Sequence, residues 1–156
     1  HLDRRDSQSF AQTGTSWYHT THLSLLRTVQ VDVRVGSDDY ISGIDIKQAS
    51  LIDDVCYGSC SGTLYRFDIG DDECISQFAQ KYTKIGSTWR MIELIVKVLN
   101  IKSGSVTTYG AYGKGSGSVS WGSFGNVNQC LANVTIKRYD AGGLMHITAA
   151  KTLYSY

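Results

Sequence analysis

Apolar and polar residues alternate one by one along several short stretches of this chain, and this period limits its fold more than any other feature. Valine occupies every second position from 29 to 35, with polar residues at 30, 32 and 34. Successive side chains of a strand point to opposite faces of a sheet, so the pattern predicts a strand over 27–35 with one buried face. Alternation resumes over 41–47 after the turn residues 36–39, which predicts a hairpin with a water-facing side.

Further alternation predicts strands over 63–69, 89–98, 132–136 and 144–152, with glycine and serine turns between them, the longest over 104–125. Residues 71–85 fit either a helix, because their apolar residues have helical spacing, or another strand. We favour the strand, because the neighbouring segments are strands and because of the resemblance described below. Many short strands without helix-length spacers predict an all-β sandwich, barrel or prism, built from three loose four-strand blocks near 15–55, 56–100 and 101–156.

Composition narrows the class of protein further. A length of 156 residues indicates one domain, and 16 Gly and 10 Tyr without Pro suit turn-rich β structure. The charges nearly balance, with 15 Lys plus Arg against 14 Asp plus Glu, so the chain lacks the strong positive potential that attracts nucleic acid. No apolar run approaches the roughly 20 residues of a membrane helix. We expect a processed, secreted product, with residues 1–15 as a flexible arm and 16–156 as the folded domain.

The four cysteines indicate disulfides in a secreted protein. Three pairings are open, and our first choice joins Cys56 to Cys60 and Cys74 to Cys130. Their spacing fits no zinc pattern, and the acidic turn over 71–73 lacks the spacing of a calcium loop, so we expect no metal and no cofactor. Asn133 begins a glycosylation sequon, which is used if this stretch is exposed; a chance triplet on a strand explains it equally well.

Enzyme chemistry has little support in the sequence. His1 with His19, His22 or His146 offers ligands for copper, which we treat as a minor alternative. No nucleophile elbow occurs in a strand-to-helix setting. We therefore expect no catalytic residues and no enzymatic activity.

Three segments in order resemble the jacalin-related lectins, whose fold is the β-prism I of three four-stranded Greek-key sheets. They are Val31-Asp-Val-Arg-Val35 followed by Ile41-Ser-Gly-Ile-Asp-Ile46; Ser61-Gly62 leading to Phe67-Asp-Ile-Gly-Asp-Asp-Glu-Cys-Ile75; and Ile92–Asn100 before Tyr109-Gly110. The secreted animal members of zymogen-granule type look closest. The resemblance implies an all-β prism that binds sugar without metal through loops at one end.

The resemblance also implies a place for the sugar site. The family uses a Gly-x-x-x-Asp loop near the C-terminus together with an early glycine loop, in which backbone N–H groups donate to sugar oxygens and a carboxylate accepts from hydroxyls. Four positions after Gly142 this chain has His146 in place of the aspartate, and Asp140 precedes the glycines. The candidate residues are Gly14, Asp140, Ala141, Gly142, Gly143, Leu144, Met145 and His146.

Some family members have a second site related by the internal symmetry of the prism. Gly36, Asp38, Asp39 and Tyr40 offer a turn, carboxylates and an aromatic ring, with the segment 58–62 as a glycine-rich partner; the alternative is an ordinary solvated hairpin turn. A separate group of aromatic residues suits a sugar-stacking platform, a self-association surface or closure of the core: Tyr109, Tyr112, Trp121 and Phe124.

These observations predict a secreted, extracellular, non-enzymatic lectin whose partners are glycans or glycoproteins. The alternative is a sugar-silent prism that assembles into a homo-oligomer, a filament or an extracellular matrix. Exposed tyrosines and a detachable N-terminal arm suit strand addition between subunits.

Overall fold

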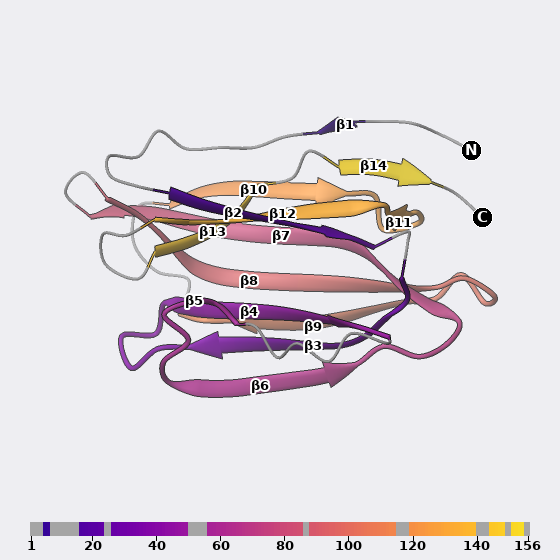
Figure 1. Ribbon diagram of the computed structural model, residues 1–156, viewed down its shortest axis with the longest axis horizontal. Coiled ribbons are helices and arrows are strands. Elements are labelled where there is room, and N and C mark those ends of the chain that lie inside the picture. Colours follow the sequence, from indigo (N-terminus) through magenta and orange to yellow (C-terminus); the bar gives the residue numbers. More distant parts are fainter. Residues whose placement is uncertain are drawn as a thin grey trace.

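A computed structural model describes residues 5–6, 16–23, 26–49, 56–85, 88–114, 119–139, 144–148 and 151–154. All regular elements in these ranges are β-strands (Figure 1). They form four antiparallel sheets of three or four strands. No helix in this part of the chain is long and apolar enough to cross a membrane.

One four-stranded sheet contains the hairpin predicted from the alternating valines. Its strands are β3 (Thr28–Val35), β4 (Ile41–Gln48), β5 (Tyr57–Gly58) and β6 (Thr63–Asp68), in the spatial order β5-β4-β3-β6. Three consecutive strands are followed by a fourth that returns beside the first, which is the Greek-key arrangement.

The second four-stranded sheet repeats this order with β10-β7-β8-β9. Its strands are β7 (Glu73–Ile85), β8 (Thr88–Asn100), β9 (Val106–Tyr112) and β10 (Val119–Gly125). The choice of a strand over a helix for the acidic segment is therefore confirmed. The prediction of one long turn over 104–125 is wrong, because β9 and β10 lie within it. β9 is an edge strand that is mostly exposed, so it lacks the apolar alternation that reveals a half-buried strand.

The remaining strands come from both ends of the chain. One sheet has the order β1-β14-β11 and the other β13-β12-β2. Their bounds are β1 (Arg5–Asp6), β2 (Ser16–His22), β11 (Cys130–Leu131), β12 (Asn133–Tyr139), β13 (Leu144–Thr148) and β14 (Lys151–Tyr154).

These two sheets correct two sequence predictions. The stretch 144–152 does not form one strand: β13 pairs with β12, whereas β14 pairs with β1 and β11. The predicted block limits are also wrong, because the Greek keys span 28–68 and 73–125, and the third group joins residues from both ends of the chain. Pairing partners that are distant in sequence leave no local signal.

The core lies between the sheets and is made mainly by the inward side chains of the two Greek keys. The largest fully buried side chains are Tyr82, Phe78, Ile41, Ile44, Met91, Ile92, Leu94 and Leu131. The outward face of the first hairpin is less open than predicted. Asp32 and Asp45 are each only 7% exposed, although their alternation assigned them to water. Asp32 is shielded by Arg66 and Lys47, which bond to its carboxylate from the neighbouring strands.

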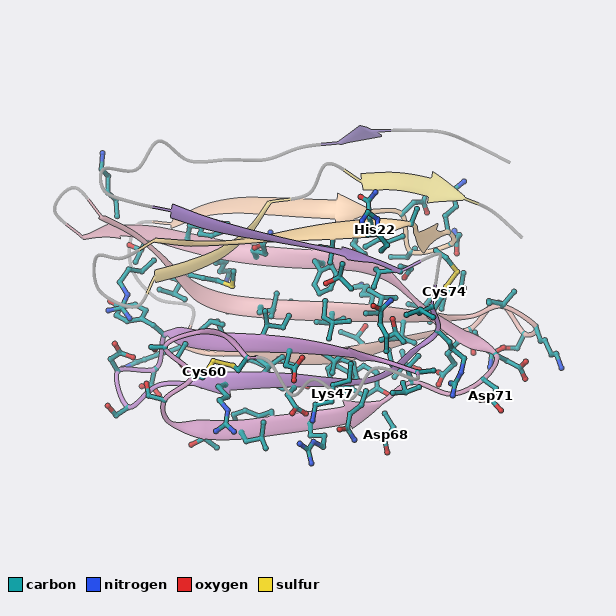
Figure 2. All side chains as sticks on the ribbon, in the orientation of Figure 1. His22, Lys47, Cys60, Asp68, Asp71 and Cys74 are labelled. Carbon is teal, nitrogen blue, oxygen red and sulfur yellow. A yellow bond between two sulfur atoms is a disulfide. The ribbon has the colours of Figure 1, made fainter. Side chains whose placement is uncertain are left out.

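Both disulfides of the first-choice pairing are present. Cys56 bonds to Cys60, and Cys74 bonds to Cys130. Figure 2 places Cys60 and Cys74 toward opposite ends of the strands. The second bridge ties the start of β7 to β11, so it links the second Greek key to the group built from the chain ends.

Candidate functional site

The turn between β3 and β4 is the best-defined candidate site, and it is held in one shape by its own backbone. The Gly36 amide donates to the Tyr40 carbonyl oxygen at 2.9 Å, and the Asp39 amide donates to the Gly36 carbonyl oxygen at 2.9 Å. Asp39 has a φ of 65°, a left-handed conformation that Asp tolerates better than most residues. The side chains of the turn therefore extend from a backbone whose conformation is fixed by these hydrogen bonds.

Arg90 of β8 fixes two of those side chains. Its guanidinium lies 3.1 Å from the Asp38 carboxylate and 4.3 Å from the centre of the Tyr40 ring. Asp38 also accepts a hydrogen bond from the Tyr40 amide at 3.2 Å. An ion pair and a cation–π contact thus share one cation, and this arrangement orders both Asp38 and Tyr40.

Asp39 differs from its neighbour. Within the part of the chain that the structure describes, its exposed carboxylate has no hydrogen-bond or ion-pair partner, and the amides of Ser37 and Asp38 have no acceptor. The turn therefore presents two backbone donors and one carboxylate acceptor side by side. This donor and acceptor set can bind vicinal hydroxyl groups.

The segment 56–62 packs against the base of this turn. The Cys56–Cys60 disulfide lies directly over Gly43 of β4, where a Cβ atom would collide with both sulfur atoms. The Cys60 amide donates to the Ser42 carbonyl oxygen at 2.9 Å. Gly62, with a φ of 90°, then passes so close to Val35 and Gly36 that a side chain at this position would overlap the backbone. The turn 36–40 and the glycine-rich segment 56–62 therefore lie side by side, while their role as a second sugar site stays a prediction.

The end of β9 completes the site. Gly113 has a φ of 88°, and a Cβ atom built on it would lie 3.2 Å from the Asp39 carbonyl oxygen. The Lys114 amide donates to that same oxygen at 3.2 Å. Residues from four separated parts of the chain therefore meet at one end of the strands: the turn 36–40, the segment 56–62, Arg90 and residues 113–114.

Arg90, Gly113 and Lys114 were not among the residues predicted for this site. A glycine followed by lysine directly after a Tyr-Gly strand was visible, and it marks a chain reversal. The position of Arg90 under a turn fifty residues away had no local signal, because it depends on how the two Greek keys pack.

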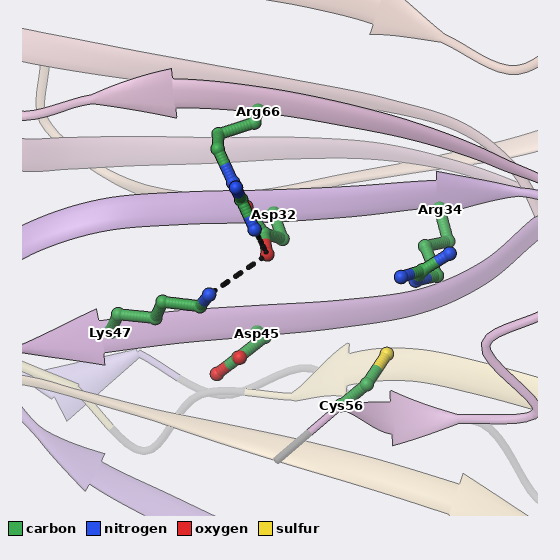
Figure 3. A pocket seen from close by; sticks show the side chains of 6 residues that line it. All are labelled: Asp32, Arg34, Asp45, Lys47, Cys56 and Arg66. Atoms are coloured by element: carbon green, nitrogen blue, oxygen red, sulfur yellow. Dashed lines mark hydrogen bonds and ion pairs between the residues drawn. The ribbon is translucent and has the colours of Figure 1, made fainter. Parts of the chain in front are cut away.

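A second polar cluster lies on the outer face of the first sheet (Figure 3). It surrounds a hollow of about 150 Å³ lined by Asp32, Arg34, Asp45, Lys47, Cys56 and Arg66. Arg66 contacts Asp32 through two hydrogen bonds of 2.7 and 2.9 Å, and Lys47 lies 3.3 Å from the same carboxylate. The hydrogen bond from Arg66 is the main cause that lowers the pKa of Asp32 below its usual value, against the opposing effect of burial. The Asp32 carboxylate is already bonded to both Arg66 and Lys47, which makes the hollow a weaker candidate than the turn.

The C-terminal candidate site lies mostly outside the described residues. Gly14 and residues 140–143 are not described. The backbone of Leu144, Met145 and His146 lies in β13, where His146 pairs with Lys137 of β12. The predicted role of this loop therefore stays a prediction.

The remaining predicted positions have mixed outcomes. Tyr109 and Tyr112 are partly buried and pack against the core, while the side chains of Trp121 and Phe124 lie outside the description. The amide oxygen of Asn133 is buried without a hydrogen-bond partner among the described residues, and use of the sequon stays a prediction. No group of three or more His, Cys, Asp or Glu suited to a metal occurs within the described ranges.

No protein-family model and no curated protein matches this sequence. Solved structures do match. Malaysian banana lectin has a TM-score of 0.69 at 16% identity, with 99% of each chain covered. Calsepa lectin in complex with a biantennary N-glycan has a TM-score of 0.64 at 12% identity, covering 100% of this chain and 99% of that one. Single-chain recombinant jacalin has a TM-score of 0.61 at 12% identity, with coverages of 98% and 95%.

The chain has the β-prism fold of the jacalin-related lectins. The predicted all-β prism is therefore confirmed, with two complete four-stranded Greek keys and a third group described as two three-stranded pieces. At identities of 12–16% these matches do not separate the zymogen-granule type from other members of this fold.

Proposed function

We propose that this protein is a secreted, non-enzymatic lectin that binds carbohydrate without metal through loops at one end of its prism. The observation that carries the proposal is the turn 36–40. Among the residues that the structure describes, its Asp39 carboxylate and two of its backbone amides have no partner, and they lie close to the glycine-rich segment that contains Gly62. The solved structures with the same fold are lectins, and one of them holds an N-glycan. We expect the partners to be glycans or glycoproteins.

Asp39 is the residue whose loss should be most informative. A carboxylate that accepts hydrogen bonds from two hydroxyls loses half of that capacity when it becomes an amide. We expect Asp39→Asn to weaken binding by about 10-fold or more, since hydrogen bonds to charged groups contribute roughly 1.5–3 kcal/mol. Asp72→Asn, at the opposite end of the strands, is the matched control and should bind as the wild type does.

The experiment is a glycan array with the native protein, these two variants and the Asp140→Ala, His146→Ala double variant. Binding lost only in Asp39→Asn supports a site at the turn 36–40. Binding lost only in the double variant moves the site to residues 140–146 and Gly14. In that case a role of His146 predicts an affinity that changes between about pH 5 and 8. Native protein that binds no glycan overturns the proposal.

A second candidate function is structural self-assembly, and two strands at the edges of the described sheets favour it. β6 and β9 are edge strands, and Leu64, Tyr65 and Val106 on them are 37–44% exposed. Unpaired strand edges can add a strand from another chain. Sedimentation velocity of native protein tests this function, because a monomer at all concentrations would remove it.

A further inference from the structure

The edge strands β6 and β9 contact each other through aromatic side chains. The rings of Tyr65 on β6 and Tyr112 on β9 lie 5.3 Å apart between centroids, tilted by 40°. One step further along, Phe67 and Tyr109 stack at 4.0 Å with nearly parallel planes. We name these four side chains the aromatic seam.

The seam begins at the candidate site. β6 starts at Thr63, directly after Gly62, and Tyr65 lies two residues further, about 7 Å along the strand. β9 ends at Tyr112, directly before Gly113, which packs against the Asp39 carbonyl oxygen. Both strands therefore lead away from the turn 36–40, and the first aromatic pair is the next surface that a ligand bound at that turn would meet.

The seam is open to a ligand at this end and closed at the other. Tyr65 is 44% exposed and Tyr112 is half-buried, whereas Phe67 is only 6% exposed. No described residue accepts a hydrogen bond from the hydroxyl of Tyr65 or Tyr112. An exposed aromatic face beside free hydroxyl groups suits a sugar ring, which has an apolar face and a polar rim.

We propose that Tyr65 and Tyr112 form an extended subsite for the second and later units of an oligosaccharide whose terminal unit binds at the turn 36–40. The inference rests on the proposed lectin function and deepens it, because it assigns the protein a preference for oligosaccharides over monosaccharides. The rings of Tyr65 and Tyr112 stack on the sugar units, and their hydroxyl groups form hydrogen bonds with the oligosaccharide.

The test compares chain length within one sugar class, starting with mannose and mannotriose, and then the matching pair of any other class that the array identifies. Calorimetric titration of the native protein should give a trisaccharide affinity about 10-fold or more above that of the monosaccharide. In Tyr65→Ala the trisaccharide should bind no more than about 2-fold more tightly than the monosaccharide. The monosaccharide affinity itself should not change. Tyr65→Phe, which retains the ring, should keep most of the gain.

Leu64→Ala is the matched control. Leu64 is 37% exposed on the same strand, but it pairs with Arg34 on the opposite face of the sheet, so its loss should leave both affinities unchanged. Equal affinity of the native protein for single sugars and chains would overturn the subsite and leave the lectin function standing. Absence of any sugar binding would overturn both.

Self-association is the competing use of the same surface. Sedimentation velocity of the native protein and Tyr65→Ala distinguishes the two. A native dimer that Tyr65→Ala dissociates, without a change in the chain-length gain, would assign the seam to a second copy of the chain and overturn the subsite. A monomer in both samples, with the gain lost in the variant, supports it.

Discussion

Two acidic turns lie at opposite ends of the strands, and they use their carboxylates differently. In the turn that precedes β7, Asp71 lies 3.1 Å from Arg27, Asp72 lies 3.5 Å from Lys102, and Glu73 accepts the Gly70 amide at 2.8 Å. Every carboxylate of that turn is engaged within the protein. Figure 2 places Asp71 at the end of the molecule away from Cys60.

The turn between β3 and β4 engages only one of its two aspartates. Asp38 is held by Arg90, whereas Asp39 has no partner among the described residues. A run of acidic residues in a turn therefore does not by itself mark a binding site. What distinguishes the turns is whether the surrounding strands supply a cation or amide for each carboxylate, and an unengaged carboxylate beside free amides is the arrangement that can receive a ligand.

The largest expected losses of stability come from removing the two disulfides, one near each end of the strands. Replacing Cys74 and Cys130 with serine opens a link between residues 56 positions apart, and replacing Cys56 and Cys60 opens one of only 4 positions. Loop-closure entropy predicts losses of about 4 and about 2 kcal/mol in the free energy of unfolding. Urea denaturation measures both.

The disulfide variants also sharpen the comparison of function. At a temperature where both are folded, the variant lacking Cys56 and Cys60 should bind glycan more weakly, because that bridge positions Gly62 under the turn 36–40. The variant lacking Cys74 and Cys130 should bind normally. The opposite pattern would place the site at the other end of the molecule.

Two glycines give losses of stability that are on average smaller than those of the disulfides. Gly62 and Gly104 have φ values of 90° and 76°, but a Cβ atom at Gly62 would meet the backbone of Val35 and Gly36, whereas Gly104 has nothing within 4 Å. We expect Gly104→Ala to cost about 1 kcal/mol from backbone conformation alone. Gly62→Ala should cost about 3 kcal/mol, because a steric clash adds to the strain. Thermal unfolding followed by circular dichroism compares them, and equal losses would contradict the close contact.

The smallest effects come from the engaged carboxylates. Asp38→Asn removes both an ion pair to half-buried Arg90 and part of the order of the turn, so we expect a loss of about 1 kcal/mol. Asp72→Asn removes an exposed pair with Lys102 and should cost about 0.3 kcal/mol. Denaturation at low and high salt measures the two losses, and a larger loss for Asp72→Asn would reverse the order that we infer.

The local alternation of apolar and polar residues was enough to predict many of the strands of this fold. The valines of β3 and the apolar residues of β8 alternate because one face of each strand is buried, so their positions were predictable. The segment that forms β7 was ambiguous by periodicity, and the neighbouring strands together with the family resemblance favoured a strand. β9 was missed because an exposed edge strand has no buried face to impose an alternating pattern on its sequence.

The candidate site shows the same division. Local turn chemistry is enough to predict that Gly36, Asp38, Asp39 and Tyr40 form a polar turn and that glycine recurs over 58–62. The packing of Gly62 and Gly113 against that turn depends on the tertiary structure. So does the pairing of Arg90 with Asp38, which leaves Asp39 without a partner among the described residues. Those contacts join residues more than twenty positions apart, and they arise from the packing of two Greek keys, which no single segment encodes.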